Sequence, residues 1–331
     1  MTPGYAELGV MTNFSFLEGA SHPAEHMIQA RALGLAAVGV ADRNTLAGVV
    51  RALMGAETAG MRLLVGCRLG FTDGTELIVF PRDRAAYGRL CRLLSVGKSE
   101  QVPGAEATAE RIAKGETRLR FDQAAAVGAG LVALAPAPEK PDAAFEARLQ
   151  AWRRAWPDVL YLAAQPLWRG GDRARLNRLA AMADRTGAPL IATNAVLYHH
   201  PDRRPLQDVL TCIREGTTID AAGRRLQANA ERQLKSPAQM ARLFRGHEAA
   251  LARTLDVVRA CSFSLRELSY DYPDEPVPPG YTAQRWLIRL TCRGARAKWP
   301  QGAPARVRTT IAKELRLIRT LRYAPYFLTV H

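Results

Sequence analysis

The stretch "GVMTNFSFLEGASHP", residues 9–23, joins a short apolar run to a polar turn and then to a helix start. The apolar run, Glu7–Met11, is typical of a buried strand. Ser21 has the position of a helix cap and Pro23 that of a first-turn proline, so we expect a helix over Pro23–Leu33. A strand that leads through a turn into a helix is the repeating unit of α/β proteins, and their sites lie at the carboxyl ends of the strands.

The same alternation continues along the chain as far as Ala192. Further strands are expected at Ala36–Ala41, Arg62–Cys67, Glu76–Phe80, Leu131–Leu134, Val159–Ala163 and Pro189–Ala192. Helices are expected between them at Thr45–Ala59, Arg82–Ser95, Asp142–Ala155 and Asp172–Thr186. Repeated strand–helix units predict an α/β fold with a parallel sheet, either open or closed into a barrel. Residues 97–117 are expected to form a loop.

The pattern becomes mainly helical beyond Arg203. The expected helices are Pro205–Arg214, Pro237–Phe244, His247–Cys261, Ala283–Lys298 and Ala305–Leu321. The stretch "SYDYPDEPVPPGYT", residues 269–282, is rich in proline and acidic residues, which predicts a boundary between two domains. The chain stops within "YAPYFLTVH", inside what reads as an element, so we expect the second domain to be truncated.

Positive charge is concentrated near the C-terminus. The net charge is +15, and the segment from Tyr281 to His331 holds eleven Lys or Arg against one acid, which makes +10. This asymmetry favours a polyanion partner, most simply nucleic acid, over the alternative of a solvated helix face. The candidate nucleic-acid contacts are Arg285, Arg289, Arg293, Arg296, Lys298, Arg306 and Arg308.

Several protein classes are excluded by what the sequence lacks. It has no Walker loop, GxGxxG, GxSxG or HExxH motif. Its five cysteines are scattered without a CxxC pair, which argues against a zinc ribbon or a disulfide framework. No apolar run approaches the roughly 20 residues of a membrane span, and the N-terminus lacks a signal peptide. We therefore expect a cytoplasmic protein with no membrane partner.

Two pairs of histidines and one acid are weaker candidates for a site. His22 and His26 could share a helix face, but no third ligand is near in sequence, so a surface pair is favoured over a metal site. His199 and His200 follow the last expected strand, where a loop position is favoured. Asp42, in the turn after the second strand, could be a ligand, a ribose contact or a local cap.

Several segments together resemble one family. They are "TNFSFLEGASHP", "VGVADRNTLAGVV", "LLVGCRLGF", "FPRDRAAYGRLCRLL", "LIATNAVLYH", "LQDVLTCIREG", "ERQLKSPAQMARLF" and "ELRLIRTLRYAPYFLTVH". In this order, and over nearly the whole chain, they resemble the start of bacterial family C DNA polymerases, most closely the error-prone, damage-inducible branch. The resemblance implies that residues 1–270 form a PHP (polymerase and histidinol phosphatase) domain, a distorted (β/α)7 barrel. Residues 271–282 would be a linker, and residues 283–331 the start of the polymerase palm.

The resemblance also implies where a metal site would lie. The ligand positions of active PHP domains are occupied here by Gly9, Met11, Asp42, Arg43, Arg68, Glu76, Leu167, Ala195 and Leu197. Only Asp42 is unchanged, so we expect no metal cofactor and no catalytic residue in this chain. The magnesium ions of the parent polymerase, a nucleotidyltransferase, would be held by palm aspartates that lie further downstream.

The substituted residues are also poorly suited to a metal. Met11 offers a soft thioether, which suits manganese or magnesium poorly. Arg43 and Arg68 bring fixed positive charge, and like charges 4 Å apart repel by about 4 kcal/mol at an effective dielectric constant of 20. We expect the two guanidinium groups to replace the metal by pairing with Asp42 and Glu76.

Three functions are compatible with these observations. The favoured one is a non-catalytic, core-supporting module of an error-prone polymerase that acts in damage-induced (translesion) DNA synthesis. The alternatives are an active metal-dependent phosphoesterase or 3′–5′ exonuclease, and a stand-alone basic nucleic-acid-binding protein. By resemblance, the partners would be the rest of the polymerase core, DNA, the sliding clamp and damage-response accessory proteins.

Overall fold

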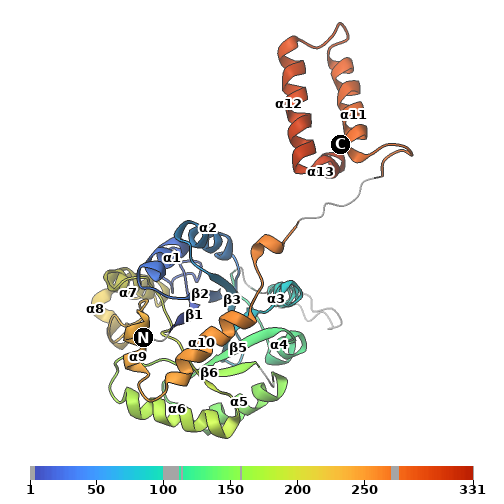
Figure 1. The fold of residues 1–331 in the computed structure, drawn as a ribbon. Coiled ribbons are helices and arrows are strands. Elements are labelled where there is room, and N and C mark those ends of the chain that lie inside the picture. The colour runs from blue at the N-terminus through green and yellow to red at the C-terminus, as the bar shows by residue number, and fades with distance from the viewer. Residues whose placement is uncertain (1–3, 100–111, 113–114, 157–158, 270–275, 331) are drawn as a thin grey trace. The chain divides into compact units, whose positions relative to one another are not determined.

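The computed structural model describes residues 4–99, 112, 115–156, 159–269 and 276–330 (Figure 1). The chain divides into two compact units, Met1–Glu267 and Leu268–His331, which we call the barrel unit and the helical unit. Part of the expected loop at 97–117 and part of the expected linker at 271–282 lie outside the described residues. In the described part of the chain, no helix combines the length and the apolar character that a membrane span requires.

The barrel unit is built on one seven-stranded sheet whose strands neighbour one another in chain order. They are β1 (Ala6–Val10), β2 (Ala37–Arg43), β3 (Leu63–Gly70), β4 (Glu76–Pro81), β5 (Leu131–Pro136), β6 (Leu160–Ala164) and β7 (Leu190–Ala192). The helices around and after the sheet are α1 (Pro23–Ala32), α2 (Val49–Ala59), α3 (Arg84–Val96), α4 (Phe121–Val127), α5 (Ala143–Ala155), α6 (Asp172–Thr186), α7 (Arg204–Arg214), α8 (Ile219–Ala222), α9 (Pro237–Leu243) and α10 (Glu248–Ala260). The expected distorted α/β barrel is confirmed (Figure 1).

The expectation of a wholly parallel sheet is wrong at one strand. The neighbours β1, β2 and β3 are parallel, as are β5, β6 and β7, but β4 is antiparallel to both β3 and β5. Only Phe71–Thr75 joins β3 to β4, and the Phe71 amide donates to the Thr75 carbonyl at 2.8 Å. A parallel crossover needs about a dozen residues or more, so this short connection can only turn the chain back.

The barrel closes through a buried carboxylate on β1. Glu7 is fully buried and accepts hydrogen bonds from the hydroxyl groups of Tyr5 and Thr193, at 2.6 and 2.8 Å, and from the backbone amide of Asn194. Burial raises the pKa of Glu7, although these donors and the charge of Lys235 favour the ionised form. The segment after β7 is thereby tied to β1 by side-chain hydrogen bonds rather than by a strand ladder.

The amino end of the barrel is covered by α10. The hydroxyl of Thr254 on α10 accepts a bond from the amide of Ala6 at the start of β1, and the Cys261 carbonyl accepts one from Arg62, just before β3. Val257 and Cys261 join the apolar cluster formed by alternate strand residues such as Leu134. The carboxyl ends of the parallel strands are therefore the end at which a site can open.

The cap of α1 and the start of α2 differ from expectation, whereas the ends of the other expected helices of the barrel unit lie within two residues of the expected ones. The N-cap of α1 is His22, because the Ser21 hydroxyl instead pairs with Nδ1 of His199 at 2.8 Å. Helix α2 begins at Val49 rather than Thr45, because Asn44 has a φ of 50° and its side chain accepts a bond from the Gly70 amide.

The helical unit contains α11 (Ala283–Lys298), α12 (Ala305–Leu321) and α13 (Ala324–Thr329), of which the first two have the expected bounds. The Thr282 hydroxyl caps α11 by accepting from the Arg285 amide. Leu287, Ile318 and Ala324 form a small apolar cluster, so little surface is buried inside this unit.

Candidate functional site

A cavity of about 400 Å³ opens at the carboxyl ends of the barrel strands, and we call it the strand-end cavity. Six of the nine expected ligand positions line it: Met11, Arg43, Arg68, Glu76, Leu167 and Ala195. Gly9, Asp42 and Leu197 lie nearby in the fold but do not line it. The structure thus brings most of these sequence-distant positions together at one end of the barrel.

Four charged side chains form a continuous network at this cavity. Arg43 pairs with both Glu18, where Nη2 lies 3.2 Å from Oε2, and Glu76. Glu76 also accepts from Nη1 of Arg68 at 2.9 Å. Burial alone would raise the pKa of Glu76, but the positive charges of Arg68 and Arg43 outweigh it and hold the pKa below its usual value. We call Glu18, Arg43, Glu76 and Arg68 the charge network.

The expected pairing of Asp42 with the arginines is wrong. Its carboxylate accepts from the amide and hydroxyl of Thr12, at 2.7 and 2.9 Å, and from the Ser15 hydroxyl at 2.7 Å. Burial raises the pKa of Asp42, and these hydrogen bonds offset part of the rise. Asp42 and Arg43 are neighbours on a strand, so their side chains point to opposite faces. Asp42 is not a local cap of its own turn either, because its partners Thr12 and Ser15 are distant in sequence and the N-cap of α2 is Gly48; it fixes the turn after β1.

Gly9 is at a β-bulge where a side chain would be strained and would meet Ile78. The register of β1 on β2 shifts between Leu8 and Val10, and Gly9 has a φ of 96°. A Cβ atom at this position would lie 2.8 Å from Cδ1 of Ile78. A histidine would be strained in this backbone conformation. Position 9 therefore differs from a metal-ligand position in its backbone as well as in its side chain.

The remaining expected positions are apolar and engaged in packing. Met11 and Leu197 are buried in one small cluster with Tyr198. Leu167 is buried at the wall of the cavity, and Ala195 contributes its carbonyl oxygen, which accepts from Nε of Arg232 at 2.8 Å. None of these four positions offers the nitrogen or oxygen side-chain donor that a catalytic cation needs.

The residues present therefore do not fit the metal centre of an active PHP domain. Among the described residues, no group of three or more His, Cys, Asp or Glu side chains is close enough to hold a metal ion. The two acids at the expected ligand positions, Asp42 and Glu76, already accept hydrogen bonds from hydroxyl, amide or guanidinium groups.

The expectation of a surface histidine pair is wrong for His26. Its side chain is fully buried, and both ring nitrogens lack a hydrogen-bond partner among the described residues, whereas His22 is exposed. Burial, and then the nearby His199, lower the pKa of His26 to about 3, so its ring is neutral at physiological pH. The apolar residues Met27 and Ala30 on the same helix mark this buried face in the sequence.

Sequence reasoning missed two arginines at the strand-end cavity. Arg169 follows β6, and Arg232 lies in the irregular segment before α9. Burial, and then the positive charges of Arg68 and Arg169, lower the pKa of Arg232 to about 10. Nothing local in the sequence marks either residue, because only the fold brings them beside Arg68.

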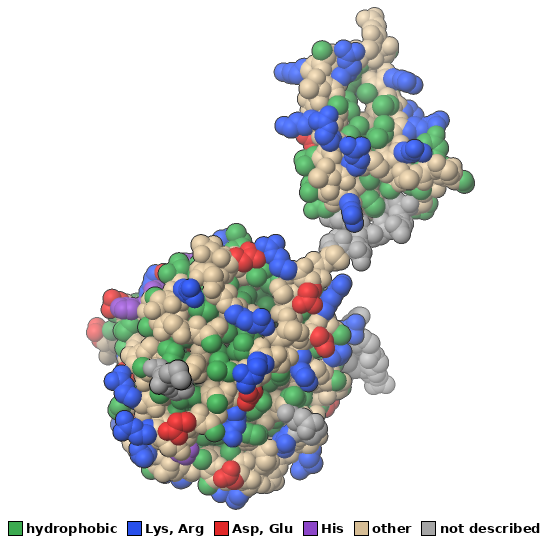
Figure 2. Space-filling model, viewed as in Figure 1, with side chains coloured by type: hydrophobic (Ala, Val, Ile, Leu, Met, Phe, Trp, Pro, Cys, Tyr) green, Lys and Arg blue, Asp and Glu red, His purple; other side chains and the backbone are tan. Residues whose placement is uncertain are grey.

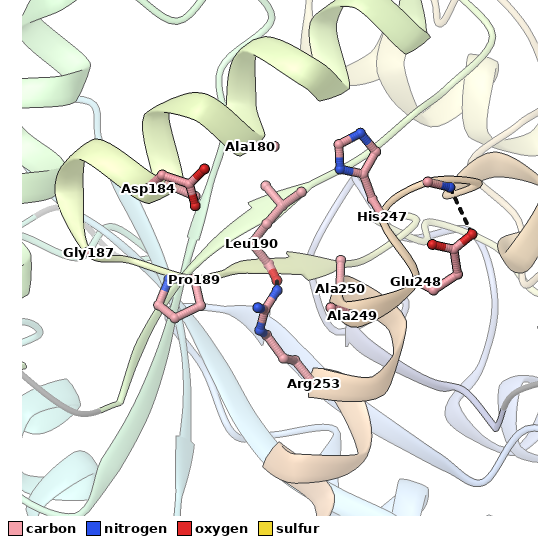
Figure 3. A pocket seen from close by; sticks show the side chains of 12 residues that line it. Ala180, Asp184, Gly187, Pro189, Leu190, His247, Glu248, Ala249, Ala250 and Arg253 are labelled. Atoms are coloured by element: carbon pink, nitrogen blue, oxygen red, sulfur yellow. Dashed lines mark hydrogen bonds between the residues drawn. The ribbon is translucent and has the colours of Figure 1, made fainter.

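A second cavity, of about 550 Å³, lies between the end of α6 and the start of α10, near the amino end of β7 (Figure 3). Two of its charged side chains bond to nearby backbone: Glu248 accepts from the Gly246 amide, and Arg253 donates to the Leu190 carbonyl at 2.8 Å. His247 pairs with Asn177 at 2.8 Å.

The basic residues of the helical unit are presented to solvent. The seven candidate contacts are all exposed, and within the described residues none of them forms an ion pair: Arg285, Arg289, Arg293, Arg296, Lys298, Arg306 and Arg308. Figure 2 shows many Lys and Arg side chains and little acidic surface on this unit. Arg289 lies over the ring of Tyr281, with 5.5 Å to the ring centre. The positive charge is therefore not neutralised within the unit.

Comparison with known proteins shows which family the sequence of this chain resembles. Residues 7–165 match the family model of the PHP domain. The chain is 51% identical over 335 residues to an error-prone DNA polymerase of Rhodopseudomonas palustris, covering 99% of this chain and 29% of that protein. It is 49% identical over 334 residues to an error-prone DNA polymerase of Brucella abortus, covering 99% of this chain and 30% of that protein. An amidohydrolase structure from Chromobacterium violaceum is 16% identical, with a TM-score of 0.42, and covers 59% of this chain and 88% of that one.

The TM-score of the amidohydrolase is too low to carry an argument about function. About half of the residues aligned between this chain and the two polymerase relatives are identical, and the alignments cover both units of the chain. This chain spans less than a third of their length. The chain therefore contains a PHP domain and is related, over nearly its whole length, to the N-terminal part of error-prone DNA polymerases.

Proposed function

We propose that the barrel unit is a non-catalytic PHP module that supports the catalytic part of an error-prone polymerase during DNA synthesis on damaged templates. The observation that carries the proposal is the charge network, in which Arg43 and Arg68 pair with Glu18 and Glu76. The network occupies the end of the barrel where a metal centre would lie, and its guanidinium groups repel cations. Ion pairs of this kind hold a site together without giving it a nucleophile or a metal-bound water.

The proposal is tested by metal content and hydrolysis in the full-length protein. The protein is dialysed against manganese and zinc, then against buffer, and its metal is measured by elemental mass spectrometry. Release of phosphate from p-nitrophenyl phosphate and 3′–5′ digestion of single-stranded DNA are assayed alongside. We expect substoichiometric metal and no hydrolysis. Stoichiometric metal together with hydrolysis that Glu76→Gln abolishes would favour the phosphoesterase instead.

One helix offers a surface on which the module could meet the rest of the polymerase. Helix α7 buries the polar side chains of Gln207 and Thr211, whereas Leu206, Val209 and Ile213 are 42%, 43% and 59% exposed. An exposed apolar helix face is typical of a surface that another part of the protein, or a partner, covers. The relatives extend far beyond the matched part, so we infer that the occupant is the polymerase part of the same protein.

Charge substitutions on this helix test the surface. Val209→Lys with Ile213→Lys in the full-length protein should leave the unfolding temperature of the barrel unit unchanged but lower polymerase activity. The control is Ala147→Lys with Gln150→Lys, which places the same charges on exposed positions of α5 that carry no large apolar side chain. Equal activity loss in both pairs, or none in the first, would contradict this assignment.

The helical unit supports a second proposal, that of a DNA-binding surface. Its candidate arginines are exposed and form no ion pair among the described residues, so they can contact the phosphate backbone, which gives sequence-independent and salt-dependent affinity. This role is compatible with the first proposal, because the module of a polymerase can contact DNA while another part performs catalysis.

A further inference from the structure

We propose that Phe16 is an aromatic anchor with which the barrel unit binds an apolar cleft in the polymerase part of the full-length protein. Phe16 lies in the turn Thr12–Gly19, which we call the β1 turn. The inference rests on the supporting role proposed above and adds a contact residue to it. It is carried by the exposure of Phe16, by the way the β1 turn is held and by the apolar face of α7.

Phe16 is the most exposed large apolar side chain among the described residues, at 82%. Moving an aromatic ring from water into an apolar cleft is strongly favourable. Single exposed apolar residues are nevertheless common on protein surfaces. The argument for a contact therefore depends on how the backbone around Phe16 is held and on what lies beside it.

The β1 turn is closed by its own backbone. The amides of Glu18 and Gly19 donate to the Ser15 carbonyl at 2.9 and 3.1 Å, and the Ser15 amide donates to the Thr12 carbonyl at 2.9 Å. A Cβ atom at Gly19 would overlap the Thr12 carbonyl oxygen, so the two ends of the turn can meet only because this residue is glycine.

Asp42 fixes the β1 turn to the end of β2. Its carboxylate accepts hydrogen bonds from Thr12 and Ser15, and the Ser15 hydroxyl in turn accepts one from the Arg43 amide at 3.1 Å. The one unchanged ligand position thus holds a loop in place instead of a cation. A loop that is already ordered loses little conformational entropy when it binds, which favours its use as a contact.

The backbone of Leu17, next to Phe16, is strained. Its φ of 59° lies in the left-handed region that leucine rarely adopts. The Leu17 carbonyl accepts a hydrogen bond from Nη1 of Arg214 on α7 at 3.1 Å. Strain of this kind persists where the surrounding structure imposes it, and it is concentrated at functional segments.

The β1 turn lies against the helix that carries the exposed apolar face. The exposed residues of that face recur along α7 at intervals of three and four, so they lie on one side of the helix. Ile213 belongs to this face, and its neighbour Arg214 bonds to the turn. Leu210 packs on the buried cluster that contains Ala20, just after the turn. Phe16 therefore extends the α7 face with an aromatic ring.

An apolar protein cleft fits this surface better than DNA does. Arg214, the cation that bonds to the turn, is already paired with Glu215 at 3.1 Å. The residues that dominate protein interfaces are typically aromatic rings that fill pockets and are surrounded by side chains that exclude water. The matched part is 29% of the Rhodopseudomonas palustris polymerase, so most of that protein lies outside it and can supply such a cleft.

Photo-crosslinking in the full-length protein tests the anchor. The photoreactive residue p-benzoylphenylalanine takes the place of Phe16, and linked peptides are identified by mass spectrometry with and without primed DNA. The control places it at Trp168, another exposed aromatic position. We expect position 16, but not position 168, to link to a segment of the same chain beyond residue 331. Links to DNA or to a second copy, or none beyond the barrel unit, would overturn the inference.

Substitutions measure what the anchor contributes. Phe16→Ala should leave the unfolding temperature of the barrel unit unchanged, because the ring is exposed, and should lower polymerase activity about tenfold. Phe16→Leu keeps an apolar side chain and should lose less. Trp168→Ala is the matched control and should act like the parent protein. Unchanged activity of Phe16→Ala, or an equal loss in the control, would contradict the anchor.

The anchor and the supporting role fail in different ways. Phe16→Ala with full activity, in a protein that holds no metal and hydrolyses nothing, would remove the anchor and leave the non-catalytic module in place. Stoichiometric metal together with hydrolysis would overturn the module itself, whatever Phe16→Ala does to polymerase activity.

Discussion

Nη1 of Arg68 and Oε2 of Glu76 lie 2.9 Å apart, on two antiparallel strands that pair Gly70 directly with Glu76. Glu76 is the first residue of β4, and the first residue of a parallel strand would lie at the opposite end of the barrel from the site. Because β4 runs antiparallel, its start meets the carboxyl end of β3. The reversal of one strand thus brings the acid to the two arginines.

Restoring a histidine at position 43 should destabilise the barrel unit. Arg43→His removes ion pairs to both Glu18 and Glu76, and we expect a loss of about 1–2 kcal/mol in the free energy of unfolding, between the values for exposed and buried pairs. The measurement is chemical denaturation at pH 7. Arg266→His is the matched control, since Arg266 forms an exposed ion pair with Glu57. Unchanged stability of Arg43→His, or a gain in metal binding, would contradict the role of the network.

Glu76 should make the protein sensitive to acid. Its pKa in the folded protein lies below the ordinary value of 4.5, so the folded state binds fewer protons than the unfolded state in this range. The stabilisation is therefore complete above pH 4.5 and is lost as the pH falls through the lower folded-state pKa. Glu76→Gln should be less stable than the parent protein at pH 7, and the difference should shrink in acid.

Denaturation curves of both proteins across the acid range give this difference directly. Asp42 and Glu7, whose pKa values burial raises, titrate in the opposite sense, but they are present in both proteins and cancel. A stability difference that stays constant between pH 7 and the acid limit would show that Glu76 is not held ionised by the arginines.

Much of this architecture could be predicted from sequence, because strand and helix periodicities are local. The antiparallel direction of β4 could also have been predicted, because the connection Phe71–Thr75 is too short for a parallel crossover. The meeting of Arg43, Arg68 and Glu76 was implied only by the resemblance to PHP domains, because a wholly parallel sheet would have put Glu76 at the other end of the barrel. Arg232 could not be found in this way, because its position depends on a long irregular segment that folds back on Ala195.

A side chain at Gly9, in the β-bulge, should lower the free energy of unfolding. Gly9→Ala forces an L residue to a φ of 96° and brings its Cβ against Ile78. Gly34→Ala is the matched control, because Gly34 has a φ of 76° and nothing within 4 Å of the added Cβ. Both should lose about 1–2 kcal/mol from backbone strain. Gly9→Ala should lose more, since the core must also move, and equal losses in denaturation experiments would mean that the bulge tolerates a side chain.

DNA affinity of the helical unit should depend on salt through its arginines. Arg285 and Arg296 lie on one side of α11, because eleven residues are close to three helical turns. Each phosphate contact contributes about 0.9 to the slope of log affinity against log salt concentration for duplex DNA. Replacing both residues by Gln in the full-length protein should therefore lower the slope by about 2.

The control replaces two exposed arginines of the barrel unit, Arg31 and Arg245, by Gln. Fluorescence anisotropy with a labelled duplex over a range of salt concentrations measures all three proteins. If the control pair lowers the slope as much as the α11 pair, the effect is one of net charge and not of a defined surface. If neither pair changes it, the proposed DNA-binding surface on the helical unit is wrong.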